Sequence, residues 1–183
     1  MTREPAIRFH TTLLPGVLHI EPLPFRDDRG LFSRLYCPEE FAAAGILLPH
    51  PFQISLSRNP TRHTLRGMHF QAAPNEEAKL VRAVRGRAYD VVIDLRRDSS
   101  QYLAWTAIEL DADAMNAMFI PPGCAHGFLT LQADTDILYQ ISPPYVPGHG
   151  LGVRWNDPLI AVRWPAEPAL FGARDAGWPD WTR

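Results

Sequence analysis

The turn residues of this chain constrain its fold more than any other feature. Eighteen prolines and twelve glycines are scattered along the 183 residues and divide the sequence into short runs. Short apolar and β-branched runs that end at turn residues are typical of strands. The sequence therefore predicts an all-β protein, with strands at residues 17–20, 52–56, 78–84, 88–95, 105–110, 117–120, 127–131 and 136–141.

Two local signals add detail to this prediction. Pro38 opens the segment 38–45, Glu39 and Glu40 follow in its first turn, and Gly45 closes it, which is typical of a helix. Gly86 lies between two predicted strands, where a tight reversal needs the positive φ angle that glycine adopts easily. Many strands at this spacing favour a double-sheet roll. The length of the chain favours one domain over residues 1–183.

The composition narrows the classes of function. The formal net charge is -2 and 46% of the residues are hydrophobic, which indicates neither a nucleic-acid-binding protein nor a disordered chain. No apolar run reaches the roughly 18 residues of a membrane helix, and the first residues do not resemble a signal peptide. Cys37 and Cys124 form no disulfide framework. We expect a small-molecule partner, no nucleic acid, no membrane, and a reduced, cytoplasmic setting.

A histidine in an apolar run is the first candidate for chemistry. His69 lies in the run Leu65–Gln71, where strand pairing is expected to bury its imidazole among apolar neighbours. Such a histidine is more often a hydrogen-bonded core residue than a catalyst. A second histidine, His126, follows the turn Pro121–Gly123. Further polar residues later in the chain, His126, Tyr139 and Asp175, make His69 a candidate base.

A metal site is one interpretation of the two histidines. Residues 121–126 resemble part of the second cupin motif, in which a turn delivers a histidine into the mouth of a small barrel. In the first motif, Gln71 stands where a second metal-binding histidine is expected, and Glu76 lies near the expected glutamate. His69, Gln71, Glu76 and His126 could hold a metal, but a neutral amide is a poor ligand for the metals that imidazole prefers. We therefore expect neither a metal nor a cofactor.

Several motifs cover nearly the whole chain. They are DRGLF at 28–32, LRGMHFQ at 65–71, KLVR at 79–82, DVVIDLR at 90–96, IPPG at 120–123, AHGF at 125–128, LY at 138–139 and RWNDP at 154–158. In order and spacing the chain resembles the dTDP-4-dehydrorhamnose 3,5-epimerase family. This resemblance implies a cupin-type double-stranded β-helix, that is, a jelly roll with few short helices, and a homodimer. It implies the fold more directly than the function.

The resemblance also implies a reaction. Members of this family remove a proton α to the C4 ketone of a nucleotide-linked 4-keto-6-deoxyhexose, at C3, C5 or both, and return one on the opposite face. This chemistry needs a base with a pKa near neutrality, a proton donor across the sugar ring, and a group that stabilises the enolate oxygen.

Individual residues acquire roles from the same resemblance. His69 corresponds to the base, and Asp175 to the carboxylate that orients its imidazole. Tyr139 corresponds to the donor on the opposite face, and Lys79 to the cation near the C4 oxygen. The diphosphate suits planar guanidinium groups. The positions that correspond to substrate-binding residues are Arg29, Gln53, Ser55, Arg66, His126 and Arg174.

Each candidate also has a structural interpretation. Lys79 could be a charge on an edge strand, Tyr139 a packed aromatic residue, and Asp175 part of a surface turn in a glycine- and proline-containing tail. We expect Trp155–Pro158 to be a structural turn. Cys124 is expected to be a small buried residue and not a nucleophile.

The nucleotide side departs from the family pattern. Leu31 and Arg34 stand where typical members have an aromatic residue that stacks on thymine and a glutamate that binds the base, both reaching into the neighbouring subunit's pocket. Ser55 replaces an asparagine, and Pro144 replaces a tyrosine that touches the diphosphate. A guanidinium only donates hydrogen bonds, so Arg34 cannot accept one from the imide of thymine. Either the base differs or it is held differently.

Three functions follow from these patterns. The leading interpretation is an epimerase of a nucleotide-linked 4-keto-6-deoxyhexose. The alternatives are a metal-dependent cupin isomerase or dioxygenase, and a cupin that binds nucleotide sugars without chemistry.

Overall fold

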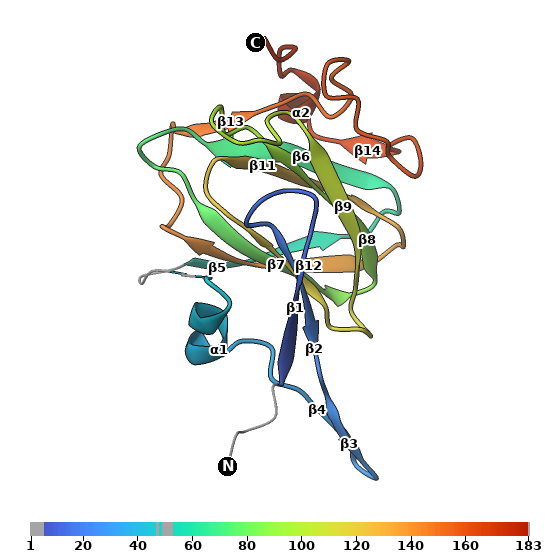
Figure 1. Ribbon diagram of the computed structural model, residues 1–183. Helices are drawn as coiled ribbons and strands as arrows, with labels where there is room; N and C mark the ends of the chain where they lie inside the picture. Colours follow the sequence, from blue (N-terminus) through green and yellow to red (C-terminus); the bar gives the residue numbers. More distant parts are fainter. Residues whose placement is uncertain (1–5, 47, 49–52, 183) are drawn as a thin grey trace.

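The computed structural model describes residues 6–46, 48 and 53–182. These residues form mainly strands, with two short helices (Figure 1). The strands are β1 (Ile7–Thr11), β2 (Leu18–Pro22), β3 (Phe25–Asp27), β4 (Gly30–Phe32), β5 (Gln53–Asn59), β6 (Thr64–Gln71), β7 (Ala78–Arg85), β8 (Arg87–Asp94), β9 (Trp105–Asp111), β10 (Ala117–Ile120), β11 (Cys124–Thr130), β12 (Thr135–Ser142), β13 (Gly150–Gly152) and β14 (Leu170–Phe171). The helices are α1 (Pro38–Ala43) and α2 (Ala173–Ala176).

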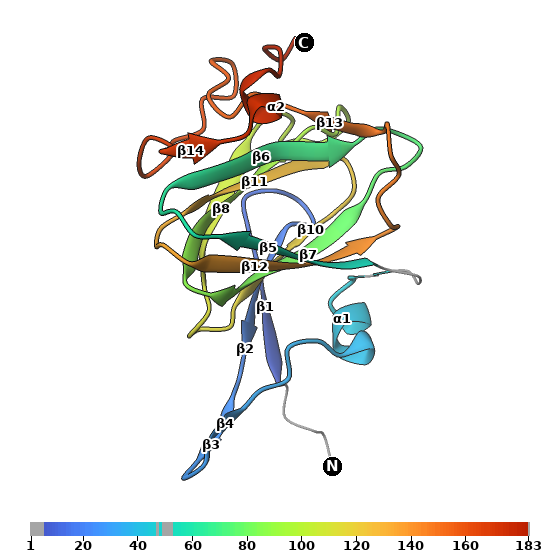
Figure 2. The same cartoon turned by 180° about the vertical axis from the view of Figure 1, so that it is seen from behind.

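Two sheets stacked on one another make up the body (Figures 1 and 2). One has the strand order β1-β2-β10-β7-β12-β5, and the other has the order β13-β6-β11-β8-β9, with β14 added beside β6. Neighbouring strands along both orders are antiparallel, whereas β14 is parallel to β6. This is the predicted double-sheet jelly roll.

The central strands have both faces buried. Val81 of β7 lies in the core between the sheets, whereas its neighbour Leu80 packs in the cluster with α1. Val92 of β8 lies in the same inter-sheet core, and Val91 packs against the C-terminal segment. Successive side chains of a strand point to opposite faces, so a strand covered on both sides needs a continuous apolar run.

The predicted strands are confirmed, with small differences at their ends. β11 begins at Cys124, earlier than the predicted start at residue 127, and α1 ends at Ala43, short of Gly45. Gly86 has the predicted positive φ, at 69°. The strand predicted at 52–56 corresponds to β5, which extends to Asn59, and residue 52 lies outside the described residues.

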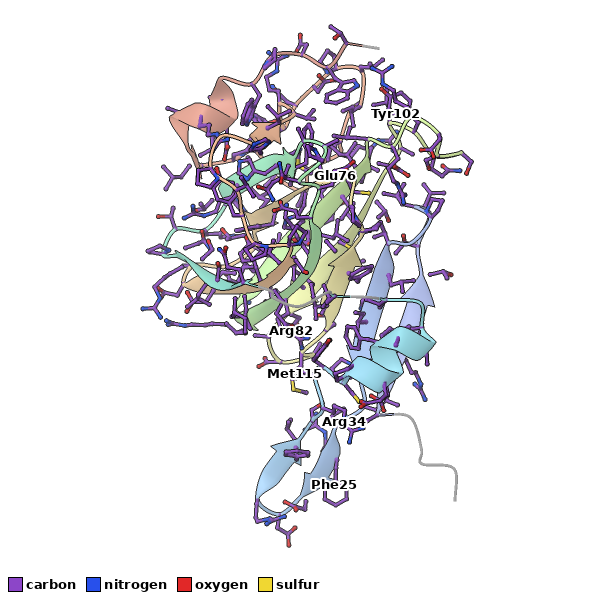
Figure 3. All side chains as sticks on the ribbon, turned by 90° about the vertical axis from the view of Figure 1, so that its left-hand side faces the viewer. Phe25, Arg34, Glu76, Arg82, Tyr102 and Met115 are labelled. Carbon is purple, nitrogen blue, oxygen red and sulfur yellow. The ribbon has the colours of Figure 1, made fainter. Side chains whose placement is uncertain are left out.

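A hairpin of β3 and β4 projects from the body, and we call residues 25–32 the arm (Figures 1 and 2). Phe25, Leu31 and Phe32 of the arm are exposed by 66%, 45% and 77%. Figure 3 shows Phe25 on the arm and Arg82 beyond its base. The buried guanidinium of Arg82 donates a hydrogen bond to the carbonyl of Leu35, 2.9 Å away, which ties the chain after the arm to the sheet.

The segment after β13 folds back across the outer face of the β6-β11-β8 sheet. The buried carboxylate of Asp157 accepts hydrogen bonds from the backbone N–H groups of Leu159, Ile160 and Trp181, so the predicted structural turn is confirmed. This turn brings α2 back to β6. Neither described helix has the length and hydropathy needed to cross a membrane.

Candidate active site

A pocket of about 360 Å³ is lined by strands of both sheets. β5, β7 and β12 form one side, and β6 and β11 form the other. Most of the residues predicted for the site therefore come together, although they are far apart in the sequence. Those that line the pocket are Gln53, Ser55, Arg66, His69, Lys79, His126, Tyr139 and Arg174.

His69 and Asp175 form a hydrogen-bonded pair. The Nε2 atom of His69 lies 2.6 Å from Oδ1 of Asp175, which comes from α2, 106 residues further along the chain. The backbone N–H of Gly67 donates to the other carboxylate oxygen at 3.2 Å. Asp175 is only 6% exposed. The interpretation of this segment as a surface turn is therefore wrong, because α2 docks on β6 and buries the carboxylate.

The protonation of the pair follows from these contacts. Burial alone would raise the pKa of Asp175, but the hydrogen bonds from His69 and Gly67 stabilise the carboxylate and hold the pKa below its usual value. An ionised carboxylate only accepts hydrogen bonds. Nε2 of His69 therefore carries the hydrogen, and Nδ1 is the nitrogen left with a lone pair.

The predicted burial of the His69 imidazole is wrong. Its side chain is 41% exposed and lines the pocket. The neighbouring Met68 is fully buried and packs with Val153 on the other face of β6. Because side chains alternate along a strand, the burial of Met68 turns His69 toward the pocket, where a substrate can reach it.

Lys79 lies at the pocket wall beside a carboxylate. Its strand, β7, is flanked by β10 and β12, so the edge-strand interpretation is wrong. The Lys79 side chain is 7% exposed, and its Nζ lies 2.7 Å from Oε1 of Glu77. It also donates to the backbone carbonyl of His69 at 3.3 Å, which links the two sheets. Glu77, which directly precedes β7, was not predicted, although its spacing of two residues from Lys79 is a signal in the sequence.

Tyr139 and His126 share the floor of the pocket. Their rings are edge to face, with centroids 6.1 Å apart, and Nε2 of His126 lies 2.7 Å from Oδ1 of the buried Asp90. Burial raises the pKa of Tyr139, and the carboxylate of Asp90 raises it further. The phenol therefore keeps its proton at neutral pH, as a proton donor must. Tyr139 also packs against the core, as its structural interpretation states, and its role as proton donor stays a prediction.

The remaining polar residues give the pocket positive charge. Arg66 donates through Nε to the amide oxygen of Asn59 at 2.8 Å, and Arg174 donates to the carbonyl of Gly150 at 2.7 Å. In the described residues both guanidinium groups thus bond to neutral oxygens, which leaves their charges for an anion. Gln53 donates to the hydroxyl of Ser55 at 2.9 Å, and both line the same wall.

Arg29 lies apart from these residues. It is at the tip of the arm, where it pairs with Asp27 and its side chain is 88% exposed, and it does not line the pocket of its own chain. Leu31 is also on the arm, and Arg34 donates through Nη1 to Glu40 at 3.1 Å.

One aromatic residue of the pocket was missed. The resemblance places a tyrosine at position 144, where this chain has Pro144, but the next residue, Tyr145, lines the pocket. The adjacent Tyr145 was the signal in the sequence, and a shift of one residue in a loop was enough to hide it.

Three of the four residues considered as metal ligands, His69, Gln71 and His126, line the pocket, and the fourth, Glu76, does not. Both polar atoms of the Gln71 amide already make hydrogen bonds to the backbone: the oxygen accepts from the N–H of Val146, and the nitrogen donates to the carbonyl of Asn75. Glu76, labelled in Figure 3, is exposed and does not line the pocket. The described residues contain no group of three or more histidine, cysteine, aspartate or glutamate side chains placed to hold a metal ion.

Cys124 is buried and without nucleophilic character. The residue is 4% exposed, and burial raises the pKa of its thiol to about 12, so the thiolate is scarce at neutral pH. This confirms the structural interpretation of Cys124.

The jelly roll and a pocket with titratable groups on two opposing sheets are an arrangement that suits an isomerase of the epimerase class. Comparison with known proteins identifies the family. A family profile for dTDP-4-dehydrorhamnose 3,5-epimerase matches residues 11–183. The chain belongs to this family.

Individual relatives agree with the profile. The chain is 37% identical over 161 residues to dTDP-4-dehydrorhamnose 3,5-epimerase of Sinorhizobium fredii, an alignment that covers 86% of this chain and 80% of the relative. The crystal structure of the Bacillus anthracis 3,5-epimerase with TDP and PPi bound has a TM-score of 0.91 and 34% identity, covering 96% of this chain and all of that one. NovW, a 4-keto-6-deoxy sugar epimerase of Streptomyces spheroides, has a TM-score of 0.90 and 34% identity, covering 97% and 89%.

The depressed pKa of Asp175 predicts a pH-dependent contribution to stability. A carboxylate whose pKa is lower in the folded state stabilises the fold above its unfolded pKa of about 3.9, and this contribution is lost as the pH falls through the folded value. We expect Asp175→Asn to lower the free energy of unfolding at pH 7 and to differ less from the wild type as the pH falls below about 4. Chemical denaturation at several pH values measures both.

A matched control is Asp180→Asn, because Asp180 pairs with Arg154 but is 52% exposed. An exposed ion pair contributes little, so this variant should follow the wild type throughout. An Asp175→Asn deficit that stays constant from pH 7 to pH 3 would contradict the assignment of the depressed pKa.

Proposed function

We propose that this protein acts in the cytoplasm, as a single-domain enzyme, on a nucleoside diphosphate-linked 4-keto-6-deoxyhexose and inverts C3, C5 or both. The observation that carries the proposal is that His69, paired with Asp175, lines one pocket together with a protonated Tyr139 from the opposing sheet. Two free cysteines, Cys37 and Cys124, support a reducing compartment.

Proton transfer across the pocket follows from this arrangement. Nδ1 of His69 takes the proton from the carbon next to the C4 ketone, and the electrons of the C–H bond move onto the carbonyl oxygen as the enolate forms. Lys79 stabilises the negative charge on that oxygen. Tyr139 then gives a proton to the same carbon from the opposite face, which inverts it. The tyrosinate and the imidazolium exchange protons with solvent before the next turnover.

The diphosphate is bound by the cationic part of the pocket. Arg66 and Arg174 present guanidinium groups whose charges are not paired with carboxylates in the described residues. Such groups bind phosphate oxygens in a bidentate manner. His126, Gln53 and Ser55 line the same pocket and add hydrogen-bonding groups.

We further propose that the enzyme is a homodimer in which the arm of one copy covers the pocket of the other. Three apolar side chains of the arm are exposed, and they do not line the pocket of their own chain. The edge strand β5 presents Ile54 and Leu56, exposed by 59% and 53%, and Leu56 is part of the pocket wall. An exposed apolar arm and an exposed apolar edge beside the pocket suit one another as an interface. Arg29 would then bind substrate in the partner's pocket.

If the arm forms the dimer interface, a charged residue on the arm should dissociate the dimer into single chains. Phe32→Glu should convert a two-chain particle into a single chain at micromolar concentration, as measured by analytical ultracentrifugation, because the carboxylate cannot be buried without a partner. Leu159→Glu is the control, because Leu159 is also exposed, at 40%, but lies outside the arm. A wild-type particle of one chain, or a Phe32→Glu dimer, would contradict this proposal.

Replacement of the base tests the proposed reaction. His69→Asn keeps the approximate shape of the side chain but cannot accept and release a proton near neutral pH, so we expect kcat to fall by about 10²–10⁴-fold with little change in thermal stability. Asp175→Asn should reduce kcat less, because the imidazole stays in place with the wrong tautomer favoured. Substantial epimerisation by His69→Asn would rule out His69 as the base.

Replacement of the donor separates the two half-reactions. Tyr139→Phe should still remove the proton but fail to deliver one to the opposite face. In D2O, nuclear magnetic resonance of the keto-sugar should therefore show deuterium entering with retained configuration and little inverted product. Equal loss of exchange and inversion would argue against Tyr139 as the donor. A wild-type protein that binds the sugar without any exchange would favour the non-catalytic binding protein instead.

The base of the nucleotide is the subject of a further prediction. Stacking contributes about 0.5–1.5 kcal/mol beyond burial, and a hydrogen bond to a charged group contributes about 1.5–3 kcal/mol. Because Leu31 and Arg34 provide neither, we expect the affinity for thymidine diphosphate to be roughly two to three decades lower than in a typical family member. Arg34 can offer donors to guanine or cytosine. In calorimetric titrations we expect guanosine or cytidine diphosphate to match or exceed thymidine diphosphate.

Leu31→Phe combined with Arg34→Glu should shift the preference toward thymidine. Because Glu40 lies 3.1 Å from Arg34, thermal unfolding of the double variant is needed to verify that the new pair of carboxylates leaves the fold intact. Tight and selective thymidine diphosphate binding by the unaltered protein would show that other residues bind the base.

A further inference from the structure

The segment between β12 and β13 passes beside the mouth of the pocket, and we call residues 143–149 the strap. Tyr145 of the strap lines the pocket, as does Gly150, where β13 begins. The ring of Tyr145 packs closely over Gly150, since a Cβ atom there would lie 3.3 Å from the ring. Tyr145 is nevertheless 44% exposed. Its position therefore depends on the backbone of the strap more than on neighbouring side chains.

The side chain of Gln71 holds the backbone of the strap by a hydrogen bond. Its side chain is 2% exposed at the end of β6. Oε1 accepts a hydrogen bond from the N–H of Val146 at 2.8 Å, and Nε2 donates to the carbonyl of Asn75 at 3.1 Å. One buried amide thus joins two loops, and the first of these bonds holds the peptide that directly follows Tyr145.

The ends of the strap are held by other groups. The N–H of Ala72 donates to the carbonyl of His149 at 3.0 Å, and the Asn75 amide lies 3.0 Å from Nδ1 of the same histidine. Arg174 donates to the carbonyl of Gly150. These contacts act at the β13 end. Two glutamine side chains bond the strap at Tyr145: Gln71 accepts the shorter hydrogen bond, from the N–H of Val146 at 2.8 Å, and Oε1 of Gln53 accepts one from the N–H of Tyr145 at 3.4 Å.

We propose that Gln71 is a positioning residue that acts through Tyr145. It holds the strap so that the Tyr145 hydroxyl faces the cationic part of the pocket, where it donates to the diphosphate of the substrate. The inference rests on the proposed function for the identity of that ligand. It explains why an amide stands at this position, because a buried glutamine that satisfies one donor and one acceptor specifies the loop without adding charge.

A double-mutant cycle tests this inference. The variants are Gln71→Met, which keeps the length of the side chain and removes both hydrogen bonds, Tyr145→Ala, and their combination. The dissociation constant of thymidine diphosphate is measured by calorimetry. We expect each single variant to bind about tenfold more weakly, and the double variant to bind no more weakly than Tyr145→Ala, because residues that act through one contact are not additive. Gln101→Met, outside the pocket, should bind like the wild type.

Contrary outcomes are equally clear. A Gln71→Met or Tyr145→Ala protein with wild-type affinity overturns the inference, as does a double variant whose loss is the product of the two single losses. If Gln71→Met does not fold, Val146→Pro removes the same hydrogen bond from the side of the strap, and the same non-additivity with Tyr145→Ala is expected. Turnover of the keto-sugar by the wild type is measured in parallel, because its absence would count against the proposed function, whereas an additive cycle in an active enzyme counts against Gln71 alone.

Discussion

The hydrogen bond between His69 and Asp175 is the interaction on which the site depends. The imidazole comes from β6 in the middle of the chain, and the carboxylate from α2 near its end. The two meet only because the C-terminal segment folds back over the sheet, held by the buried carboxylate of Asp157. A short helix that would be unstable alone is thus fixed by tertiary contacts, and its one buried carboxylate sets which nitrogen of His69 carries the hydrogen.

Each of the two sheets supplies part of the remaining polar residues of the pocket. The sheet that contains β6 and β11 supplies His69, Arg66 and His126, whereas the opposing sheet supplies Lys79 and Tyr139. In the proposed reaction, a sugar ring bound between them would meet His69 on one face and Tyr139 on the other. Because the central strands β7 and β8 are packed on both faces, the separation of His69 and Tyr139 is set by the stacking of the two sheets.

The sequence predicted the strands well because their apolar runs are long and their turns are marked by glycine and proline. It could not show which face of β6 is covered, since both faces carry apolar neighbours, and so the exposure of His69 was predicted wrongly. The resemblance placed the principal residues of the pocket, but not their partners Glu77 and Asp90. Asp90 meets His126 through the pairing of β8 with β11, which the sequence does not specify. The role of Arg29 could not be placed either, because it lies at the tip of the exposed arm and does not line the pocket of its own chain.

The tautomer of His69 is the most direct test of this account. In protein labelled with ¹⁵N at histidine, nuclear magnetic resonance of the neutral imidazole should show Nε2 protonated and Nδ1 unprotonated, because the Asp175 carboxylate accepts the Nε2 hydrogen. Asp175→Asn should shift the population toward the other tautomer. A wild-type His69 that carries its hydrogen on Nδ1 would contradict the assignment of Nδ1 as the base, and with it the proposed course of the reaction.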